Sequence, residues 1–71
     1  MENNFIPVNS SMIKEVQYLQ GVNALLVRFH NDSVYRYTGV TNRLYKVMMS
    51  AESVSKFFIV NIKTLPCTKM E

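Results

Sequence analysis

The sequence has 71 residues and a mass of 8.2 kDa, which is enough for one hydrophobic core and too little for two. Hydrophobic residues make up 48% of the chain and charged residues 18%, a balance that excludes intrinsic disorder. No apolar run exceeds four residues, so we expect no membrane-spanning segment and no membrane partner. The first residues lack the cationic and apolar parts of a secretion signal, and we therefore expect a cytoplasmic protein.

The charge balance is mildly basic. Eight Lys and Arg residues face five Asp and Glu residues, and two of the acids, Glu2 and Glu71, sit at the ends of the chain, where order is least expected. The remainder therefore carries eight basic and three acidic side chains. A surplus of this size favours anionic partners, although it is far from that of a dense nucleic-acid-binding tail.

Side chains for catalysis or metal binding are scarce. The chain has one histidine, His30, one cysteine, Cys67, and three acids away from its ends, Glu15, Asp32 and Glu52. A metal site of three or four ligands is not expected from this set, and a lone cysteine excludes an internal disulfide. We predict a protein without catalytic residues, metal or cofactor, and not an enzyme.

Residues 13–38 alternate between apolar and polar side chains and are interrupted twice by turn-forming residues. This pattern is typical of antiparallel strands joined by short loops. We expect the loops at residues 20–23 and 31–33, where Gly, Asn, Asp and Ser favour turns. The predicted strands are residues 13–19, 24–30 and 34–38.

A helix is expected next. Leu44, Val47, Met48 and Ala51 recur with the spacing of one helical face, and Thr41 is a suitable N-cap. The following stretch, residues 53–63, is ambiguous, because its apolar residues favour a strand while Ser53 favours a second helix N-cap. The fold class predicted is α+β, a three-stranded antiparallel meander packed against one or two C-terminal helices. We expect one domain over residues 1–71, with a core of about 6–63 and tails at 1–5 and 64–71.

The pairing of the strands decides which side chains face away from the helices. A four-residue first loop pairs Glu15 with Arg28 and Val16 with Val27. A three-residue second loop, flanked by His30 and Val34, makes three further pairs. These pairs are Phe29 with Tyr35, Val27 with Tyr37, and Arg28 with Arg36.

A two-residue turn at residues 31–32 is the alternative. It brings Arg28 beside Tyr35 and leaves two tyrosines on the open face, while it buries Arg36 beside Val27. We favour the three-residue loop, because burying an unpaired guanidinium costs several kcal/mol.

The favoured pairing places Glu15, Arg28 and Arg36 in one row on the open face of the sheet. Two neighbouring guanidinium groups are able to hold a phosphate between them, or form a solvated face in which Glu15 bridges to Arg28. Tyr35 and Tyr37 are either core residues or platforms on which bases stack. The candidate nucleic-acid or anion-binding residues are Arg28, Arg36, Tyr35, Tyr37, Arg43 and Lys63.

An ordered series of residues between about 6 and 63 resembles the KTSC domain family. The family is named for its occurrence at the C-terminus of some lysyl-tRNA synthetases and also occurs as a stand-alone bacterial protein. The resemblance implies a compact α+β module of unestablished function that has been suggested to bind RNA, and it favours a helix over residues 53–62. The series comprises Val8, Ser11, Ile13, Val16, Tyr18, residues 29–37 with Tyr35-Arg36-Tyr37, Gly39-Val40, Leu44-Tyr45, Ser53, Phe57-Phe58 and Ile62-Lys63.

The chain departs from the family pattern at several positions. Where the family usually has asparagine and arginine, this chain has Ile59 and Lys63, which weakens any ligand site that those two residues form in relatives. The other departures are Ser33 for a turn glycine, Thr41 for proline, Leu19 for aspartate and Ser55 for glycine.

Two functions are therefore expected as alternatives. The first is a small non-enzymatic binding module for RNA or another nucleotide-containing anion. The second is a protein-interaction module, such as a small bacterial or phage-encoded regulator that acts on a host protein. The chain is expected to be a monomer or a homodimer.

Overall fold

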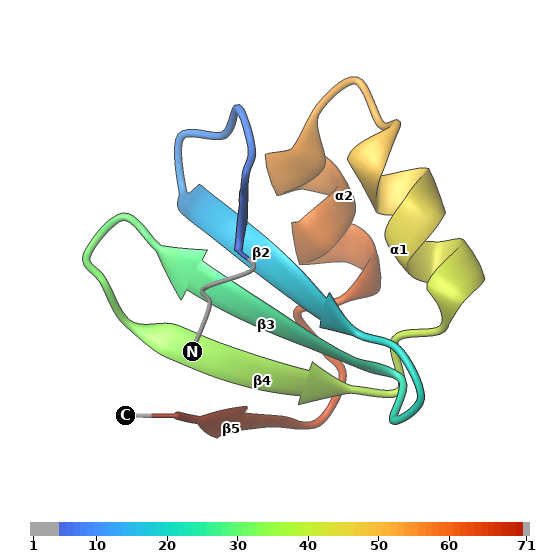
Figure 1. Cartoon of the computed structure of the whole chain (residues 1–71). Coiled ribbons are helices and arrows are strands. Elements are labelled where there is room, and N and C mark those ends of the chain that lie inside the picture. Colours follow the sequence, from blue (N-terminus) through green and yellow to red (C-terminus); the bar gives the residue numbers. More distant parts are fainter. Residues whose placement is uncertain (1–4, 71) are drawn as a thin grey trace.

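The computed structural model describes residues 5–70, which form a five-stranded antiparallel sheet with two helices against one of its faces (Figure 1). The strands lie in the sheet in the order in which they occur in the chain. Neither helix in this part of the chain has the length or apolarity that crossing a bilayer requires. The elements are β1 (Ile6–Pro7), β2 (Ile13–Leu19), β3 (Ala24–Phe29), β4 (Val34–Thr38), α1 (Asn42–Met49), α2 (Val54–Asn61) and β5 (Cys67–Lys69).

The α+β class is confirmed, but the sheet has five strands in place of the predicted three. The predicted strands are β2, β3 and β4, and β3 ends at Phe29, one residue before the expected end. The additional strands β1 and β5 lie at the two edges, and β5 falls in a segment predicted to be a tail. Strands of two and three residues are too short to leave an alternating pattern in the sequence.

Both predicted helix N-caps are confirmed. The Thr41 hydroxyl accepts a hydrogen bond from the Leu44 N–H at 3.1 Å, and the Ser53 hydroxyl accepts one from the Lys56 N–H at 3.3 Å. The ambiguous stretch after Ser53 is therefore helical, as the family resemblance implied. The helix places Phe58 and Ile62 one turn apart on the same side, where both are fully buried. Burial of that side outweighs the strand preference of the individual residues.

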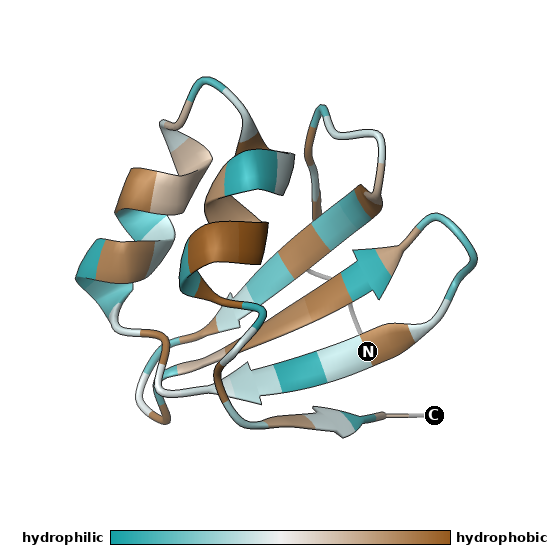
Figure 2. Ribbon diagram, turned by 180° about the vertical axis from the view of Figure 1, so that it is seen from behind, coloured by the Kyte–Doolittle hydropathy of each residue, from teal (hydrophilic) through white to brown (hydrophobic). Residues whose placement is uncertain are grey.

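The hydrophobic core lies between the helices and the sheet face that they cover, and Figure 2 shows both helices in front of that face. The side chains that fill it come from alternate positions of β2, β3 and β4 and from the inner sides of both helices. The central residues are Ile13, Val16, Leu25, Val27, Tyr37, Val40, Met48, Phe58 and Ile62.

The hairpin of β2 and β3 has the predicted register. Glu15 lies opposite Arg28, and Val16 lies opposite Val27. A bulge before Glu15 inserts one additional residue into β2, so that Ile13 also points into the core.

The predicted pairing of β3 with β4 is wrong. Val27 lies opposite Tyr35 and Leu25 opposite Tyr37, while Arg28 faces Val34 and does not face Arg36. The loop has three residues, as predicted, but it begins one residue earlier, at His30.

Local hydrogen bonds explain the earlier start of the loop. Phe29 pairs with Ser33 through an N–H to carbonyl bond of 2.9 Å, and the Asn31 side chain accepts a bond from the Ser33 N–H at 3.0 Å. Asp32 closes the loop with φ of 72°, a left-handed conformation that aspartate tolerates. The shift moves each partner by two residues, so the same side chains still face the helices.

The left-handed conformation predicts the effect of two substitutions at Asp32. Asp32→Val places a β-branched residue at positive φ and should lower the free energy of unfolding by about 1–2 kcal/mol. Asp32→Gly also removes the exposed ion pair with Lys14 but adopts positive φ without strain, so its unfolding free energy should stay within about 0.5 kcal/mol of the original. Urea denaturation of the two variants compares them, and an equal loss in both would contradict the loop geometry.

The raised pKa of Tyr37 leads us to expect a loss of stability in alkaline solution. Burial in the core, with smaller contributions from Cys67 and Tyr35, raises the pKa of Tyr37 from 10.0 to about 12. The folded protein holds this proton more tightly than the unfolded chain, so the contribution of Tyr37 to stability should be constant below pH 10 and be lost between pH 10 and about 12. In Tyr37→Phe this component of the pH dependence should disappear, which chemical denaturation at several pH values measures. An identical alkaline decline in both proteins would exclude Tyr37 as its source.

Candidate nucleic-acid interface

The sheet face opposite the helices carries both arginines predicted for anion binding. Arg36 lies in a row across the middle of this face, opposite Leu26 on β3 and Thr68 on β5. Arg28 lies in the neighbouring row, between Glu15 on β2 and Val34 on β4. We call this surface the open face, and Figure 1 shows that neither helix covers it.

The positive charge of Arg28 is largely compensated by its neighbours. Its Nε donates to Oε2 of Glu15 at 2.8 Å, and both side chains are about three-quarters buried. The guanidinium carbon also lies 4.9 Å from the centre of the Phe5 ring, a cation–π distance. The predicted contact between Glu15 and Arg28 is thus present. It uses Nε and leaves the two terminal nitrogens of Arg28 without a hydrogen bond among the described residues.

Arg36 has no acidic partner within residues 5–70. Its side chain is half-buried, and its Nε is buried without a hydrogen-bond acceptor in that part of the chain. An unsatisfied buried N–H costs about 1–3 kcal/mol, more when the group is charged. Among residues 5–70, Arg36 is therefore the arginine of the open face that lacks an acidic partner.

The two guanidinium groups are not a directly opposed pair. Arg28 faces Val34, and Arg36 is two residues further along β4, which makes the arginines diagonal neighbours. Side chains in diagonal positions are about 7–8 Å apart at their bases, so two long arginines still reach a common ligand. The corrected register also removes the like-charge contact that the predicted pairing required.

The tyrosines of β4 lie on the helix-covered side of the sheet. Tyr37 is 5% exposed, and its ring meets the edge of Phe58 at a centroid distance of 5.2 Å. Tyr35 is half-buried and packs edge-on against Phe29. Of the two roles left open for this pair, the structure places Tyr37 in the core, and neither ring belongs to the open face.

The remaining predicted residues belong to the helical layer. Arg43 is exposed in the first turn of α1, and Lys63 is exposed just after α2. The structure therefore brings Arg28 and Arg36 together and separates both from Arg43 and Lys63.

No cluster of potential metal ligands is present among the described residues. His30 points to the backbone, since its Nε2 lies 2.9 Å from the Ser10 carbonyl oxygen. The Ser10 hydroxyl in turn contacts the Ser55 hydroxyl and accepts bonds from two backbone N–H groups. This network joins the loop after β1 to α2, and Ser55 is one of the positions at which the chain departs from the family pattern.

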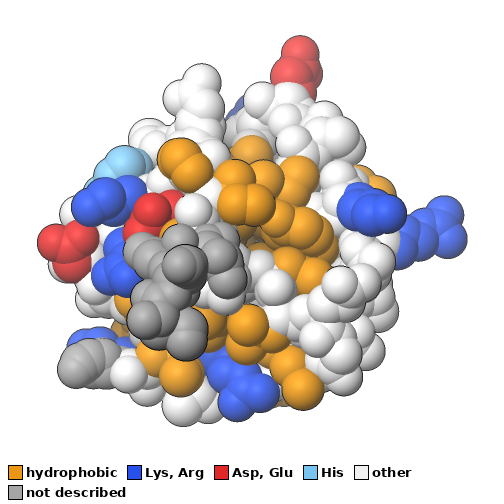
Figure 3. Space-filling view, in the orientation of Figure 1, with side chains coloured by type: hydrophobic (Ala, Val, Ile, Leu, Met, Phe, Trp, Pro, Cys, Tyr) orange, Lys and Arg blue, Asp and Glu red, His pale blue; other side chains and the backbone are white. Residues whose placement is uncertain are grey.

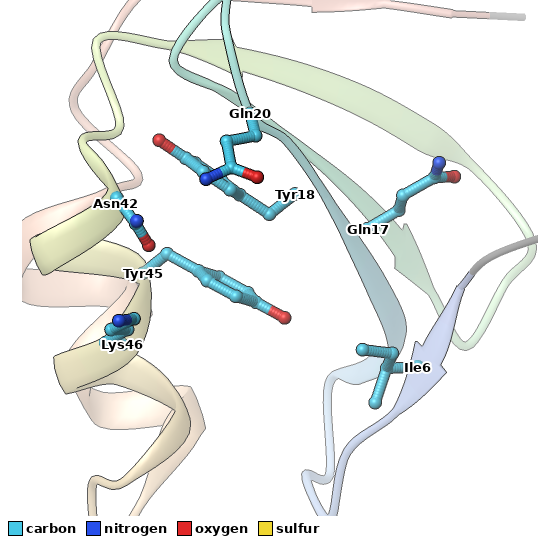
Figure 4. A pocket seen from close by; sticks show the side chains of 7 residues that line it. All are labelled: Ile6, Gln17, Tyr18, Gln20, Asn42, Tyr45 and Lys46. Carbon is cyan, nitrogen blue, oxygen red and sulfur yellow. The ribbon is translucent and has the colours of Figure 1, made fainter.

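The structure also contains a groove that was not predicted from the sequence. A groove of about 430 Å³ lies between β2 and α1, and stacked rings of Tyr18 and Tyr45 form part of its wall (Figure 4). Its lining residues come from separate strands, a loop and a helix, and such residues carry no joint signal in the sequence. The residues lining it are Ile6, Gln17, Tyr18, Gln20, Asn42, Tyr45 and Lys46, and we call it the β2–α1 groove.

Comparison with known proteins identifies the family. The sequence model of the KTSC domain matches residues 9–64. A crystal structure of a KTSC domain protein from Yersinia pestis is similar over 96% of this chain and 97% of that chain, with a TM-score of 0.90 and 33% identity. No curated protein matches the chain. On these two matches, which agree with the ordered residue series in the sequence, the chain belongs to the KTSC domain family.

Proposed function

We propose that the protein is a non-enzymatic module that binds single-stranded RNA, or another nucleotide-containing anion, on the open face of its sheet. The observation that carries the proposal is Arg36, a half-buried cation that has no acidic partner within residues 5–70. An anionic ligand supplies the counter-charge that this part of the chain lacks. The suggestion of RNA binding for the KTSC family points in the same direction.

The distribution of charge supports the proposal. Of the three acidic residues between positions 5 and 70, Glu15 and Asp32 are engaged in ion pairs with Arg28 and Lys14. The other six basic residues in this range have no ion pair there, and they give the surface a positive potential that attracts anions. They are Arg36, Arg43, Lys46, Lys56, Lys63 and Lys69.

The geometry of the open face favours contacts to phosphates over contacts to bases. The terminal nitrogens of Arg28 and Arg36 form no hydrogen bonds to described residues, and a guanidinium pairs well with a phosphate through two parallel bonds. Among the described residues, the Phe5 ring lies near Arg28, and the guanidinium is already placed over it. Phosphate contacts would supply affinity, and the shape of the chain more than its bases would supply selectivity.

Binding of a short single-stranded RNA should depend on salt and on Arg36. Two phosphate contacts to a single strand predict a slope of about −1.4 in log affinity against log salt, hence roughly a sevenfold loss between 50 and 200 mM. Arg36→Gln should reduce the slope by about 0.7, and fluorescence anisotropy at four salt concentrations measures both quantities. Arg36→Lys keeps the charge but not the paired bonds, and should bind with intermediate affinity.

Lys56→Gln is the matched control for this experiment. Lys56 is exposed on α2, in the layer opposite the open face, and its substitution removes the same charge. Equal losses in Arg36→Gln and Lys56→Gln would show attraction by net charge alone and would contradict a site on the open face.

We propose self-association through α2 as a second candidate function. The outer side of this helix exposes 45% of Ile59 and 74% of Val60. A hollow of about 550 Å³ beside it is lined by the apolar Ala51, Phe57 and Val60 and by the polar Glu52, Ser53, Lys56 and Asn61. The exposed Lys56 and Asn61 border these apolar side chains, and an exposed apolar patch with a polar rim is typical of a protein contact. Cores of this size rarely supply more than about 3–5 kcal/mol, and pairing with a second copy is one way to add to them.

Self-association predicts a concentration-dependent dimer. Sedimentation velocity should show dimers of the original protein at high micromolar concentration and only monomers of Val60→Asp, because the carboxylate would be desolvated at the contact. Val60 is exposed, so the variant should keep its fold and its RNA affinity. A wild-type chain that remains monomeric at millimolar concentration would exclude this function.

A further inference from the structure

We propose that the β2–α1 groove binds a nucleoside monophosphate unit, either as a free nucleotide or as one residue of single-stranded RNA. The proposal rests on the proposed function for its class of ligand. It uses different residues, since neither Arg28 nor Arg36 lines the groove. The volume of about 430 Å³ lies within the range of about 300–1,000 Å³ typical of small-molecule sites.

The aromatic surface for a base is the tyrosine pair. The rings of Tyr18 and Tyr45 lie 4.8 Å apart and within 10° of parallel, and both side chains are half-buried. Burial also raises the pKa of Tyr45 above its usual value. A base that packs against such a ring gains about 1–3 kcal/mol without a requirement for sequence.

The groove is held in shape at the end where α1 begins. The Tyr18 hydroxyl donates to the Val40 carbonyl oxygen at 2.8 Å and lies 3.2 Å from Oδ1 of Asn23. The Asn23 carbonyl oxygen accepts bonds from the N–H groups of Gly39 and Val40, both at 3.0 Å. These bonds fasten the β2–β3 loop to the start of α1, so little ordering is needed when a ligand binds.

Amide side chains around the rings match the edges of a nucleobase. Figure 4 shows Gln20 and Asn42 at the end of the groove near the start of α1, while Gln17 projects from β2 on the opposite side. None of the three forms a side-chain hydrogen bond with the described residues. A free carboxamide both donates and accepts, which is the pattern that bases present along their edges.

Lys46 supplies the contact for the phosphate. It lies one turn after Asn42 on α1, and it is the single charged residue among the described residues that line the groove. No acidic side chain occurs in the first turn of α1, and the exposed Arg43 precedes Lys46 by three residues. In the space-filling view, hydrophobic side chains cover the region between β2 and α1, and Lys and Arg side chains lie at its margin (Figure 3). A ligand with an aromatic base and a phosphate matches this arrangement.

An NMR titration with defined fragments tests the site. Adenosine monophosphate should shift the amide resonances of Gln20, Asn42 and Lys46, and ribose 5-phosphate, which lacks the base, should bind at least fivefold more weakly. Adenosine, which lacks the phosphate, should also bind at least fivefold more weakly. Inorganic phosphate alone should leave the resonances of Gln20 unmoved. Adenosine monophosphate that moves none of the groove resonances at 5 mM would overturn the site.

Substitutions at Tyr45 test whether its aromatic ring, and not only a folded chain, is needed for binding. Tyr45→Phe keeps the ring and should bind adenosine monophosphate within twofold of the original protein, whereas Tyr45→Leu should lower the affinity at least tenfold. Lys46→Gln should lower it about fivefold, and Lys56→Gln, the matched exposed lysine on α2, should leave it unchanged. Equal affinities of Tyr45→Phe and Tyr45→Leu, or of Lys46→Gln and Lys56→Gln, would contradict the site.

A titration with oligoadenylate distinguishes the two sources of the nucleotide and the two proposals. An oligomer that shifts the groove resonances, and binds more tightly than the mononucleotide in an Arg36-dependent manner, indicates a single strand that spans both surfaces. Equal affinities for oligomer and mononucleotide indicate a free nucleotide. An oligomer that shifts only resonances around Arg28 and Arg36 overturns the groove site and leaves the proposed function standing. Binding of the mononucleotide at the groove without any binding of the oligomer supports the groove site and contradicts RNA binding on the open face.

Discussion

The backbone conformation of Asp32 determines which side chains meet across the sheet. With Asp32 at positive φ, the loop closes on Phe29 and Ser33, and every later residue of β4 takes its partner on β3 from that point. The register that results separates Arg28 from Arg36 and keeps the β4 tyrosines under the helices. A shift of one residue would expose those rings and bury Arg36, so the chemistry of the open face depends on this loop.

The two faces of the sheet have different electrostatic roles. The covered face is apolar and contains the buried Tyr37, whose proton is held tightly because a phenolate there would lose its hydration. On the open face, Glu15 compensates Arg28, while no acid within residues 5–70 compensates Arg36. Within residues 5–70, Arg36 is thus a cation without an acidic partner on the sheet face that the helices leave uncovered.

Prediction from the sequence succeeded where the signal was local. Alternation within a few residues predicts the three central strands, and loop length predicts the register of β2 with β3. Side-chain chemistry predicts the helix caps at Thr41 and Ser53. Prediction failed for the hairpin of β3 and β4. Asn31, Asp32 and Ser33 each suit a turn, so the loop can begin at either of two residues without a change in length. Prediction also missed β1 and β5, which are too short to show a period.

By itself, the sequence determined the α+β class, the apolar side of each central strand and the scarcity of catalytic groups, because these depend on composition and on short-range periodicity. Only the tertiary structure decided that residues 54–61 are helical, since that depends on the burial of Phe58 and Ile62 against the sheet. The β2–α1 groove is likewise a tertiary feature. Its two rings, Tyr18 and Tyr45, are 27 positions apart in the sequence, and they stack only because the helix crosses the sheet beside β2.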